Sequence, residues 1–450
     1  MDVAPIVAIV PVVILVAFIV LLVKRRIVDG SSGLDMRGVI GVLAVVMMAV
    51  MVMGCFVPGD GQERADFELY DCVPASSFGS GVSVSGSAEI VEIGGTEYVR
   101  MADLGNFSVV ASGTERSYTV GKASLDLVLL SGQSNSMYYT APRYLAGQPS
   151  PVAPGKAFYL GSPDPINADF AGLATQSSIG TAGIVDLVAD DGTCRVAQMY
   201  PTFMADYVSE TGNRVLVVNS GLPGRGIAKW DTGEECDVWN ADVLARAKAL
   251  EDQGLVELRP VVALWSQGEA DTWQSQDYYK SHLVPFLGRL SDGHYSGYVF
   301  DEQISVLPRY PNFSYENMSN PAKAQLSIAS EDRHFHIASD LPYRFGPELI
   351  RDSVHYTQPA YGWLGEAFAR EAASVMGLRP VAETIVICED VGAVQELPRT
   401  VTCYGTSGES FELSVAWSET ETGYEGTLSG NPAGTQIRPG LAAQAELSSG

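Results

Sequence analysis

Positive charge is scarce in this sequence. Its 450 residues include 28 Lys and Arg against 53 Asp and Glu, which gives a formal net charge of −25. Nucleic acids and anionic lipid surfaces are bound through basic side chains, so this balance argues against both as partners. We therefore expect no nucleic-acid binding, and the acidic field also mildly disfavours polyanionic substrates.

Cysteine is also scarce, with six residues in the whole chain. No CxxC pair and no Cys/His cluster has the spacing of metal ligands, so we expect neither a metal site nor a cofactor. If the chain lies in an oxidising compartment, Cys194 with Cys236 and Cys388 with Cys403 are candidate disulfides. Unpaired buried cysteines remain the alternative, because a sequence does not fix connectivity.

Long apolar runs are confined to the N-terminus, at residues 5–23 and 39–57, with the basic residues 24–26 between them. Each run is long enough to cross a bilayer. Positive residues stay in the cytoplasm, so the N-terminus and everything after Val57 should lie outside. This predicts a membrane anchor over residues 1–58.

A second interpretation of the same region is a lipoprotein signal. In that case Met36 is the true first residue, the apolar run follows it, and Cys55 carries the lipid. Both interpretations tether the chain to the cell membrane and place its bulk on the extracytoplasmic side.

Two strand-rich segments flank a longer middle segment. Residues 59–123 contain short alternating pieces separated by turns, which predicts strands without chemistry of their own. Residues 380–450 have the same texture, which predicts a β-sandwich. The pieces LPRTVTCYG and GYEGTLSG in this tail resemble bacterial Ig-like repeats of cell-surface proteins.

The middle segment, residues 124–379, alternates apolar strands with amphipathic helices. This order predicts an α/β domain, a three-layer α/β/α sandwich with a parallel sheet, whose ligands bind beyond the carboxyl ends of the strands. Residues 142–193 lack periodicity and are expected to form a long loop near the binding site. The expected strands are 125–130, 215–219, 261–265, 303–307 and 334–338, and the expected helices are 200–211, 241–253, 276–290, 321–331 and 359–376.

Polar residues follow three of these strands. After the first come Gln133, Ser134 and Asn135, so a buried strand presents Ser134 as a candidate nucleophile. In isolation, this stretch is better explained by Ser134 or Asn135 as a cap of the next helix. The stretch 219–230 follows the second strand, and there Gly224 can offer a backbone N–H to an oxyanion, although a plain turn explains it too.

The third strand is followed by Trp265-Ser-Gln-Gly-Glu-Ala-Asp271. The Gln267 amide is a second candidate oxyanion donor. Glu269 and Asp271 are expected to hold the loop by accepting hydrogen bonds from backbone N–H groups. Trp265 is expected in the core, whereas Trp230 and Trp273 are candidates for stacking on a sugar.

Asp352 precedes His355 by three residues, just before the last helix. A carboxylate at this spacing can orient the histidine and stabilise the imidazolium, so His355 can act as a general base toward Ser134. An ordinary surface pair is the alternative for any single Asp-x-x-His. The other histidines have no comparable setting.

Together these stretches resemble the SGNH or GDSL-like hydrolases. The closest branch contains sialate O-acetylesterases and acetylxylan esterases of carbohydrate esterase family six. The similar motifs are GQSN at 132–135, W-x-Q-G-E-x-D at 265–271 and D-x-x-H at 352–355. The second block departs from the family's pair of adjacent glycines, and it places Arg225 near the pocket with Gly224 as the aligned glycine.

The resemblance implies an esterase that removes acetyl groups from sugar hydroxyls. Ser134, His355 and Asp352 would be the catalytic residues, and Ser134, Gly224 and Gln267 the oxyanion donors. Gln133, Asn135, Arg225, Trp230 and Glu269 would serve the substrate or the loops. A glycan-binding adhesion protein on the same fold, and an acetyltransferase or lipase-like use of the same residues, are the alternatives.

Overall fold

The computed structural model divides the chain into two units, Met1–Arg64 and Ala65–Gly450. The predicted anchor, including Cys55, lies outside the described residues. Within the described ranges no helix is both long and apolar enough to cross a membrane. The structure describes residues 65–137, 149–161, 183–314, 317–377, 384–386, 389–391, 397, 399–405, 410–420, 423–429 and 442–447.

A seven-stranded sheet forms the middle of the second unit, in the order β10-β9-β11-β8-β12-β13-β14. All neighbours pair in parallel except β10, which is antiparallel to β9. The prediction of an α/β domain with a parallel sheet is therefore confirmed, with one antiparallel edge. The strands are β8 (Ala123–Gly132), β9 (Ala157–Gly161), β10 (Gly183–Asp186), β11 (Val215–Asn219), β12 (Val256–Ser266), β13 (Glu302–Val306) and β14 (Phe335–Ser339).

The loop predicted over residues 142–193 is wrong in part, because β9 and β10 lie within it. Ala157, Phe158 and Tyr159 of β9 pair with Val215, Leu216 and Val217 of β11. Strand β9 is only five residues long and ends in glycine, so it gives little periodic signal in the sequence. Its partner β11 lies more than fifty residues further along the chain. Strand formation here is decided by pairing in space.

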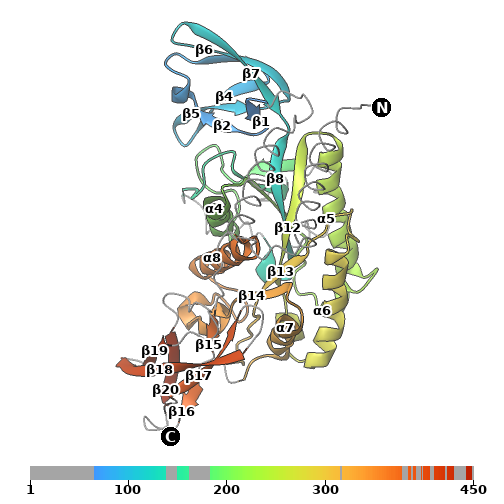
Figure 1. The fold of residues 1–450 in the computed structure, drawn as a ribbon, viewed down its shortest axis with the longest axis vertical. Helices are drawn as coiled ribbons and strands as arrows, with labels where there is room; N and C mark the ends of the chain where they lie inside the picture. Colours follow the sequence, from blue (N-terminus) through green and yellow to red (C-terminus); the bar gives the residue numbers. More distant parts are fainter. Residues whose placement is uncertain are drawn as a thin grey trace, which may run out of the picture. The chain divides into compact units, whose positions relative to one another are not determined.

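Helices cover both faces of this sheet (Figure 1). The side chains of β8 alternate accordingly: Leu125, Leu127 and Leu129 join one apolar core, while Val128 and Leu130 join the other. Helices α5, α6 and α7 contribute to the first core, and α4 and α8 to the second. These helices are α4 (Tyr200–Thr211), α5 (Glu235–Asp252), α6 (Gln276–Ser291), α7 (Asn320–Glu331) and α8 (Gln358–Val375).

The segment before the α/β part forms two small sheets, in the orders β1-β7-β6-β3 and β2-β5-β4. Arg214, only 8% exposed, binds this segment through Glu68 and the Leu69 carbonyl, and it also donates to the Gly155 carbonyl. The strands are β1 (Phe67–Glu68), β2 (Cys72–Pro74), β3 (Ser83–Gly86), β4 (Ala88–Ile93), β5 (Thr96–Met101), β6 (Gly105–Ala111) and β7 (Thr114–Gly121).

The described strands of the tail belong to one six-stranded sheet, in the order β15-β17-β18-β19-β20-β16. Short strands are expected in this tail from its alternating texture, and the described residues include six of them. The packing of two sheets into a sandwich and the Ig-like resemblance stay predictions. These strands are β15 (Thr384–Val386), β16 (Glu389–Val391), β17 (Thr400–Gly405), β18 (Ser410–Thr420), β19 (Gly423–Ser429) and β20 (Ala442–Leu447).

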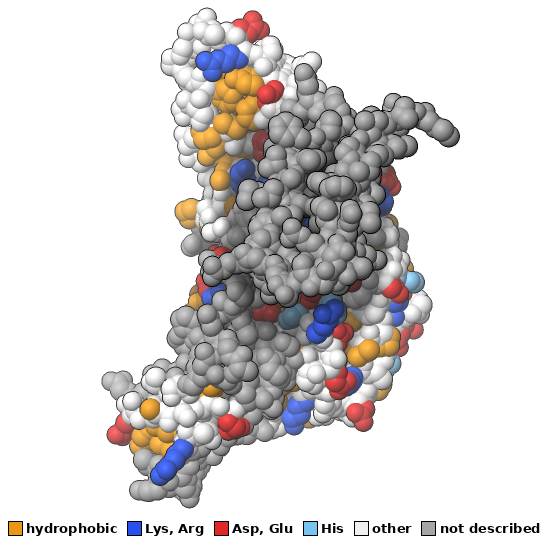
Figure 2. Space-filling view, viewed as in Figure 1, with side chains coloured by type: hydrophobic (Ala, Val, Ile, Leu, Met, Phe, Trp, Pro, Cys, Tyr) orange, Lys and Arg blue, Asp and Glu red, His pale blue; other side chains and the backbone are white. Residues whose placement is uncertain are grey.

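Acidic and basic side chains lie interspersed on the described surface of the view in Figure 2. Two of the ion pairs in the described part of the chain are Lys280 with Glu331 and Arg246 with Asp242. Such exposed pairs add little to stability. The fold is held mainly by the two cores on either side of the central sheet.

Candidate active site

The candidate nucleophile lies at the carboxyl end of β8, the strand between β11 and β12. Gly132 has φ +137°, and a Cβ there would lie 2.1 Å from the Ser266 carbonyl oxygen, so this close approach requires glycine. The backbone N–H of Gln133 donates to the same oxygen at 3.0 Å. The short 3₁₀ turn η2 (Ser134–Ser136) follows, and Ser134 is therefore held on a tight turn at 5% exposure.

The structure brings Ser134, His355 and Asp352 together. Ser134 Oγ lies 2.9 Å from His355 Nε2. On the other side of the ring, His355 Nδ1 lies 2.9 Å from Asp352 Oδ2. A neutral imidazole that donates from Nδ1 to the carboxylate leaves Nε2 free to accept the serine proton.

Asp352 is fixed by its own loop. Its Oδ1 accepts the backbone N–H groups of Val354 and His355, each at 2.8 Å. Partial burial acts to raise the Asp352 pKa, but these two hydrogen bonds and the His355 ring lower it below its usual value. The carboxylate therefore stays ionised at neutral pH and keeps the imidazole oriented.

Ser134 and His355 open into a pocket of about 660 Å³. Its wall is built from the loops that follow the four strands β8, β11, β12 and β13 and from the loop that carries His355. The pocket is much larger than an acetyl group, so it has room for the alcohol part of an ester. The lining residues are Gln133, Ser134, Leu222, Pro223, Gly224, Arg225, Glu269, Ala270, Tyr310, Val354 and His355.

Two of the three predicted oxyanion donors lie on this pocket. Gly224 is at a turn with φ +67°, a conformation that favours glycine. Among the described residues, neither the Ser134 nor the Gly224 backbone N–H has a hydrogen-bond acceptor. Both N–H groups are thus available to a ligand oxygen.

The prediction that Gln267 is the third oxyanion donor is wrong. Its side chain is fully buried and does not line the pocket. Its Nε2 donates to the Arg225 carbonyl at 3.1 Å and to Asp271 Oδ2 at 2.5 Å, and its Oε1 accepts from Tyr279. Both amide hydrogens are used inside the protein, so Gln267 holds neighbouring loops together.

Asn135 links three parts of the site. Its Nδ2 donates to Glu269 Oε1 at 2.6 Å and to the Val354 carbonyl at 3.3 Å, while its Oδ1 accepts from Tyr361. Asn135 is fully buried, so it positions the loops around Ser134 and does not face substrate. Tyr361, Val354 and Tyr310 are site residues that no sequence pattern singles out.

Some of the remaining loop residues line the pocket, and others hold the loops in place. Gln133 lines the pocket, and its Oε1 accepts the Ala270 N–H at 3.2 Å. Asp271 accepts the Ile227 N–H at 2.8 Å, as expected of a loop-holding carboxylate. Glu269 accepts from the Asn135 side chain, whereas a backbone donor was expected, and burial raises its pKa.

Arg225 lines the pocket, but its guanidinium is already paired. It forms two hydrogen bonds to Glu235, at 2.8 and 2.7 Å, and a third to the Pro223 carbonyl. About a third of the side chain is exposed. Arg225 therefore presents mainly the edge of a neutralised ion pair to the pocket.

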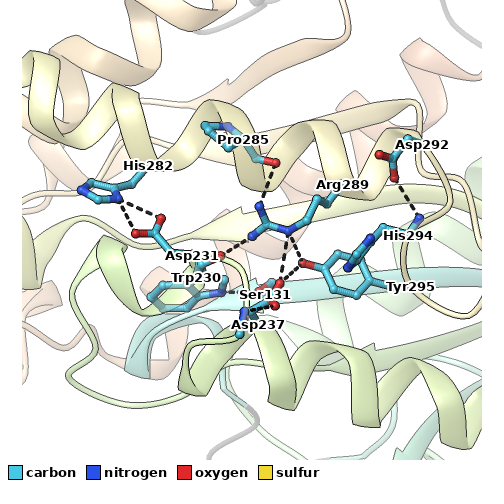
Figure 3. Close-up of polar contacts among 11 residues, drawn as sticks. Ser131, Trp230, Asp231, Asp237, His282, Pro285, Arg289, Asp292, His294 and Tyr295 are labelled. Carbon is cyan, nitrogen blue, oxygen red and sulfur yellow. Dashed lines mark hydrogen bonds and ion pairs between the residues drawn. The ribbon is translucent and has the colours of Figure 1, made fainter.

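Trp230 is not a sugar-stacking residue, which corrects the sequence expectation. It is fully buried in the turn η5 (Ile227–Trp230) and packs edge-on against Trp265 at 5.1 Å between ring centroids. Its Nε1 donates to Ser131 Oγ and its carbonyl accepts from Arg289, as Figure 3 shows. A sugar ring has no access to it.

The candidate disulfide between Cys194 and Cys236 is also wrong, because both cysteines are free and buried. Burial raises the Cys236 pKa well above its ordinary value. Cys388 lies outside the described residues. In the part of the chain that the structure covers, no three His, Cys, Asp or Glu side chains are placed to hold a metal ion.

No model of a known protein family matches the sequence, and a search of curated proteins finds no match either. Several solved structures are similar at low identity. A protein from Arabidopsis thaliana shares 18% identity over 55% of this chain and 98% of its own, with a TM-score of 0.37. A carbohydrate acetylesterase from Xanthomonas citri shares 12% over 78% of this chain and 86% of its own, also with a TM-score of 0.37.

A carbohydrate acetylesterase from Sinorhizobium meliloti shares 14% identity over 56% of this chain and all of its own, with a TM-score of 0.30. Identity and structural similarity are both low in these pairs. The function of this chain is therefore inferred from the geometry of its own site.

Proposed function

We propose that this protein is a serine esterase that removes acetyl groups from carbohydrate hydroxyls. The single observation that carries the proposal is the hydrogen-bonded chain from Ser134 Oγ through the His355 ring to Asp352. Each of its two hydrogen bonds is 2.9 Å long, and Ser134 and His355 line the pocket. A hydroxyl placed in this way is an activated nucleophile. The specificity for acetylated sugars is supported by the motif resemblance and by a pocket larger than the acyl group.

In the first half-reaction Ser134 Oγ attacks the ester carbonyl carbon while His355 Nε2 takes the hydroxyl proton. The Asp352 carboxylate stabilises the imidazolium, and the Ser134 and Gly224 N–H groups donate to the oxyanion. As the intermediate collapses, the bond to the sugar oxygen breaks and His355 returns the proton to that oxygen. Acetyl-Ser134 and the free sugar hydroxyl result.

In the second half-reaction water attacks acetyl-Ser134. His355 takes a proton from the water, and that proton returns to Ser134 Oγ when acetate leaves. The His355 side chain is 31% exposed, so water can reach the base. This exposure favours hydrolysis over transfer to another acceptor, which would need a site that excludes water.

We also propose that the enzyme is tethered to the cell membrane by its N-terminal segment, with the catalytic domain outside. The support is the pair of apolar runs and the basic residues between them. A protease added to intact cells should then digest the α/β domain. Protection of that domain until the cells are lysed would contradict the orientation.

The esterase proposal predicts covalent capture of Ser134. The wild-type protein should hydrolyse 4-nitrophenyl acetate, and an organophosphate should abolish that activity while adding one phosphoryl group to the peptide that contains Ser134. Mass spectrometry locates the adduct. Full activity after stoichiometric labelling, or an adduct elsewhere, would refute the assignment. Acetate release from acetylated xylan, sialic acid and cell-wall glycans then identifies the sugar.

Replacing Gln267 should lower stability more than catalysis. In Gln267→Leu the Asp271 carboxylate loses a buried donor, which costs about 1–3 kcal/mol of unfolding free energy. Because the Gln267 amide does not reach the pocket, kcat on 4-nitrophenyl acetate should stay within about threefold, measured below the unfolding transition. A loss of kcat of roughly 100-fold in a folded variant would restore Gln267 as an oxyanion donor.

A further inference from the structure

Trp273 is the most exposed large hydrophobic side chain that the structure describes, at 76%. It lies in the loop between η6 (Glu269–Asp271) and α6, three residues after Ala270 of the pocket wall. An exposed indole keeps apolar area in water, and contact with a ligand would remove that area from water and stabilise the complex.

A second aromatic ring stands beside it. The Phe313 and Trp273 ring centroids are 6.4 Å apart with an interplanar angle of 55°. Phe313 closes a turn on Tyr310, since its N–H donates to the Tyr310 carbonyl at 3.0 Å. Tyr310 lines the pocket, so both rings are joined to the pocket wall by short stretches of chain.

The turn that carries Trp273 is held in place. The Gln274 N–H donates to the Asp271 carbonyl at 2.8 Å, which closes the turn that carries Trp273. Asn320 Nδ2 donates to the Gln274 carbonyl at 2.6 Å and ties this turn to the start of α7. Thr272 is 3% exposed and anchors the turn from inside. A ring held on a fixed backbone loses little entropy when it binds a ligand.

We infer that Trp273 and Phe313 form a platform for a sugar ring of the acetylated saccharide, outside the pocket that holds the ester. The inference rests on the proposed function for the identity of that saccharide. A pyranose presents an apolar C–H face and a rim of hydroxyls. The Trp273 and Phe313 rings offer an apolar surface, and their sequence neighbours Gln274 and Asn312 are exposed polar residues. This combination matches the apolar face and the hydroxyl rim of a sugar.

The platform makes the enzyme selective for oligomeric substrates over small esters. A protein partner fits less well, because a stable protein interface buries on the order of 1,000 Å² or more, far beyond two rings. The sugar next to the acetylated one would stack on Trp273 while the ester carbonyl lies at Ser134. Binding energy from this remote ring then favours long substrates.

The test compares a small ester, 4-nitrophenyl acetate, with an acetylated saccharide. The saccharide is an acetylated xylo-oligosaccharide, unless the enzyme hydrolyses another acetylated saccharide of the panel faster, in which case that one is used. Trp273→Ala should lower the ratio of kcat/KM for saccharide to that for the small ester by about tenfold, mainly through KM. Trp273→Tyr should restore most of the ratio. Trp363→Ala is the matched control, because Trp363 is also exposed and tilted against a phenylalanine, Phe345.

An unchanged ratio in Trp273→Ala, for every acetylated saccharide of the panel, overturns the platform. An equal fall in Trp363→Ala overturns it as well. A measurement of saccharide binding that does not depend on hydrolysis tests the platform independently of the esterase proposal. Calorimetric titration of the saccharides into Ser134→Ala should give heat that the Ser134→Ala, Trp273→Ala double variant lacks, whether or not the wild type hydrolyses them. Equal heats in the two variants would also refute the platform.

Discussion

Ser134→Ala should lower kcat on 4-nitrophenyl acetate by roughly 10⁴- to 10⁶-fold, the loss seen when a serine hydrolase is deprived of its nucleophile. The physical reason is that no other hydroxyl in the described site lies within hydrogen-bonding distance of His355. Without Oγ the acyl-enzyme cannot form, and only the oxyanion donors and the binding contacts remain. Initial rates over a wide range of enzyme concentration measure the residual activity.

Two controls accompany this variant. Its melting temperature should stay close to that of the wild type, because alanine fits the space of serine and the Ser134 hydroxyl makes no described hydrogen bond other than the one to His355. The double variant Ser134→Ala, His355→Ala should be no slower than Ser134→Ala alone, since the two residues act as one unit. Hydrolysis at the wild-type rate by Ser134→Ala would end the esterase proposal.

Asp352→Ala should lower kcat by about 100-fold. Where the orienting carboxylate is buried, removing its charge costs roughly 10⁴-fold. The Asp352 side chain is 49% exposed, so water screens part of its charge and partly replaces it, and the effect should be smaller. The variant also leaves two backbone N–H groups, of Val354 and His355, without their acceptor, which loosens the loop.

Glu269→Gln is the matched comparison, because Glu269 is the one carboxyl group among the described residues that line the pocket, whereas Asp352 lies behind His355. Glu269 is bonded to Asn135 and has no hydrogen bond to His355 among the described contacts. Burial raises its pKa, and a neutral amide of the same shape can still accept from Asn135. This variant should keep kcat within about threefold, whereas a larger loss than in Asp352→Ala would make Glu269 the partner of His355.

The order of the functional residues along the chain was readable from the sequence. Ser134, Gly224 and the loop of Glu269 each follow an apolar run, and parallel strands deliver the residues after their carboxyl ends to one edge of the sheet. Asp352 and His355 are three residues apart, so their contact is local. The strand at 215–219 and the helix at 200–211 have the same bounds in the structure.

The burial of individual side chains could not be predicted from the sequence. Gln267 and Trp230 have the residue types of an amide donor and of a sugar platform, yet both side chains point into the interior. The Gln267 amide accepts from Tyr279 of α6, and the Trp230 indole donates to Ser131 of β8; both partners belong to other elements of the chain. A local pattern carries no information on such partners. Trp273 has the same side chain as Trp230, yet it is 76% exposed.

Local periodicity and spacing were enough to place each functional residue after its strand and to pair Asp352 with His355. The contact between Ser134 Oγ and His355 Nε2, across a separation of 221 residues, became visible in the folded chain. The tertiary structure also decided that β9 joins the sheet and that Asn135 ties the Ser134 turn to the His355 loop. These outcomes follow from how helices and strands pack, which burial of apolar surface sets for the chain as a whole.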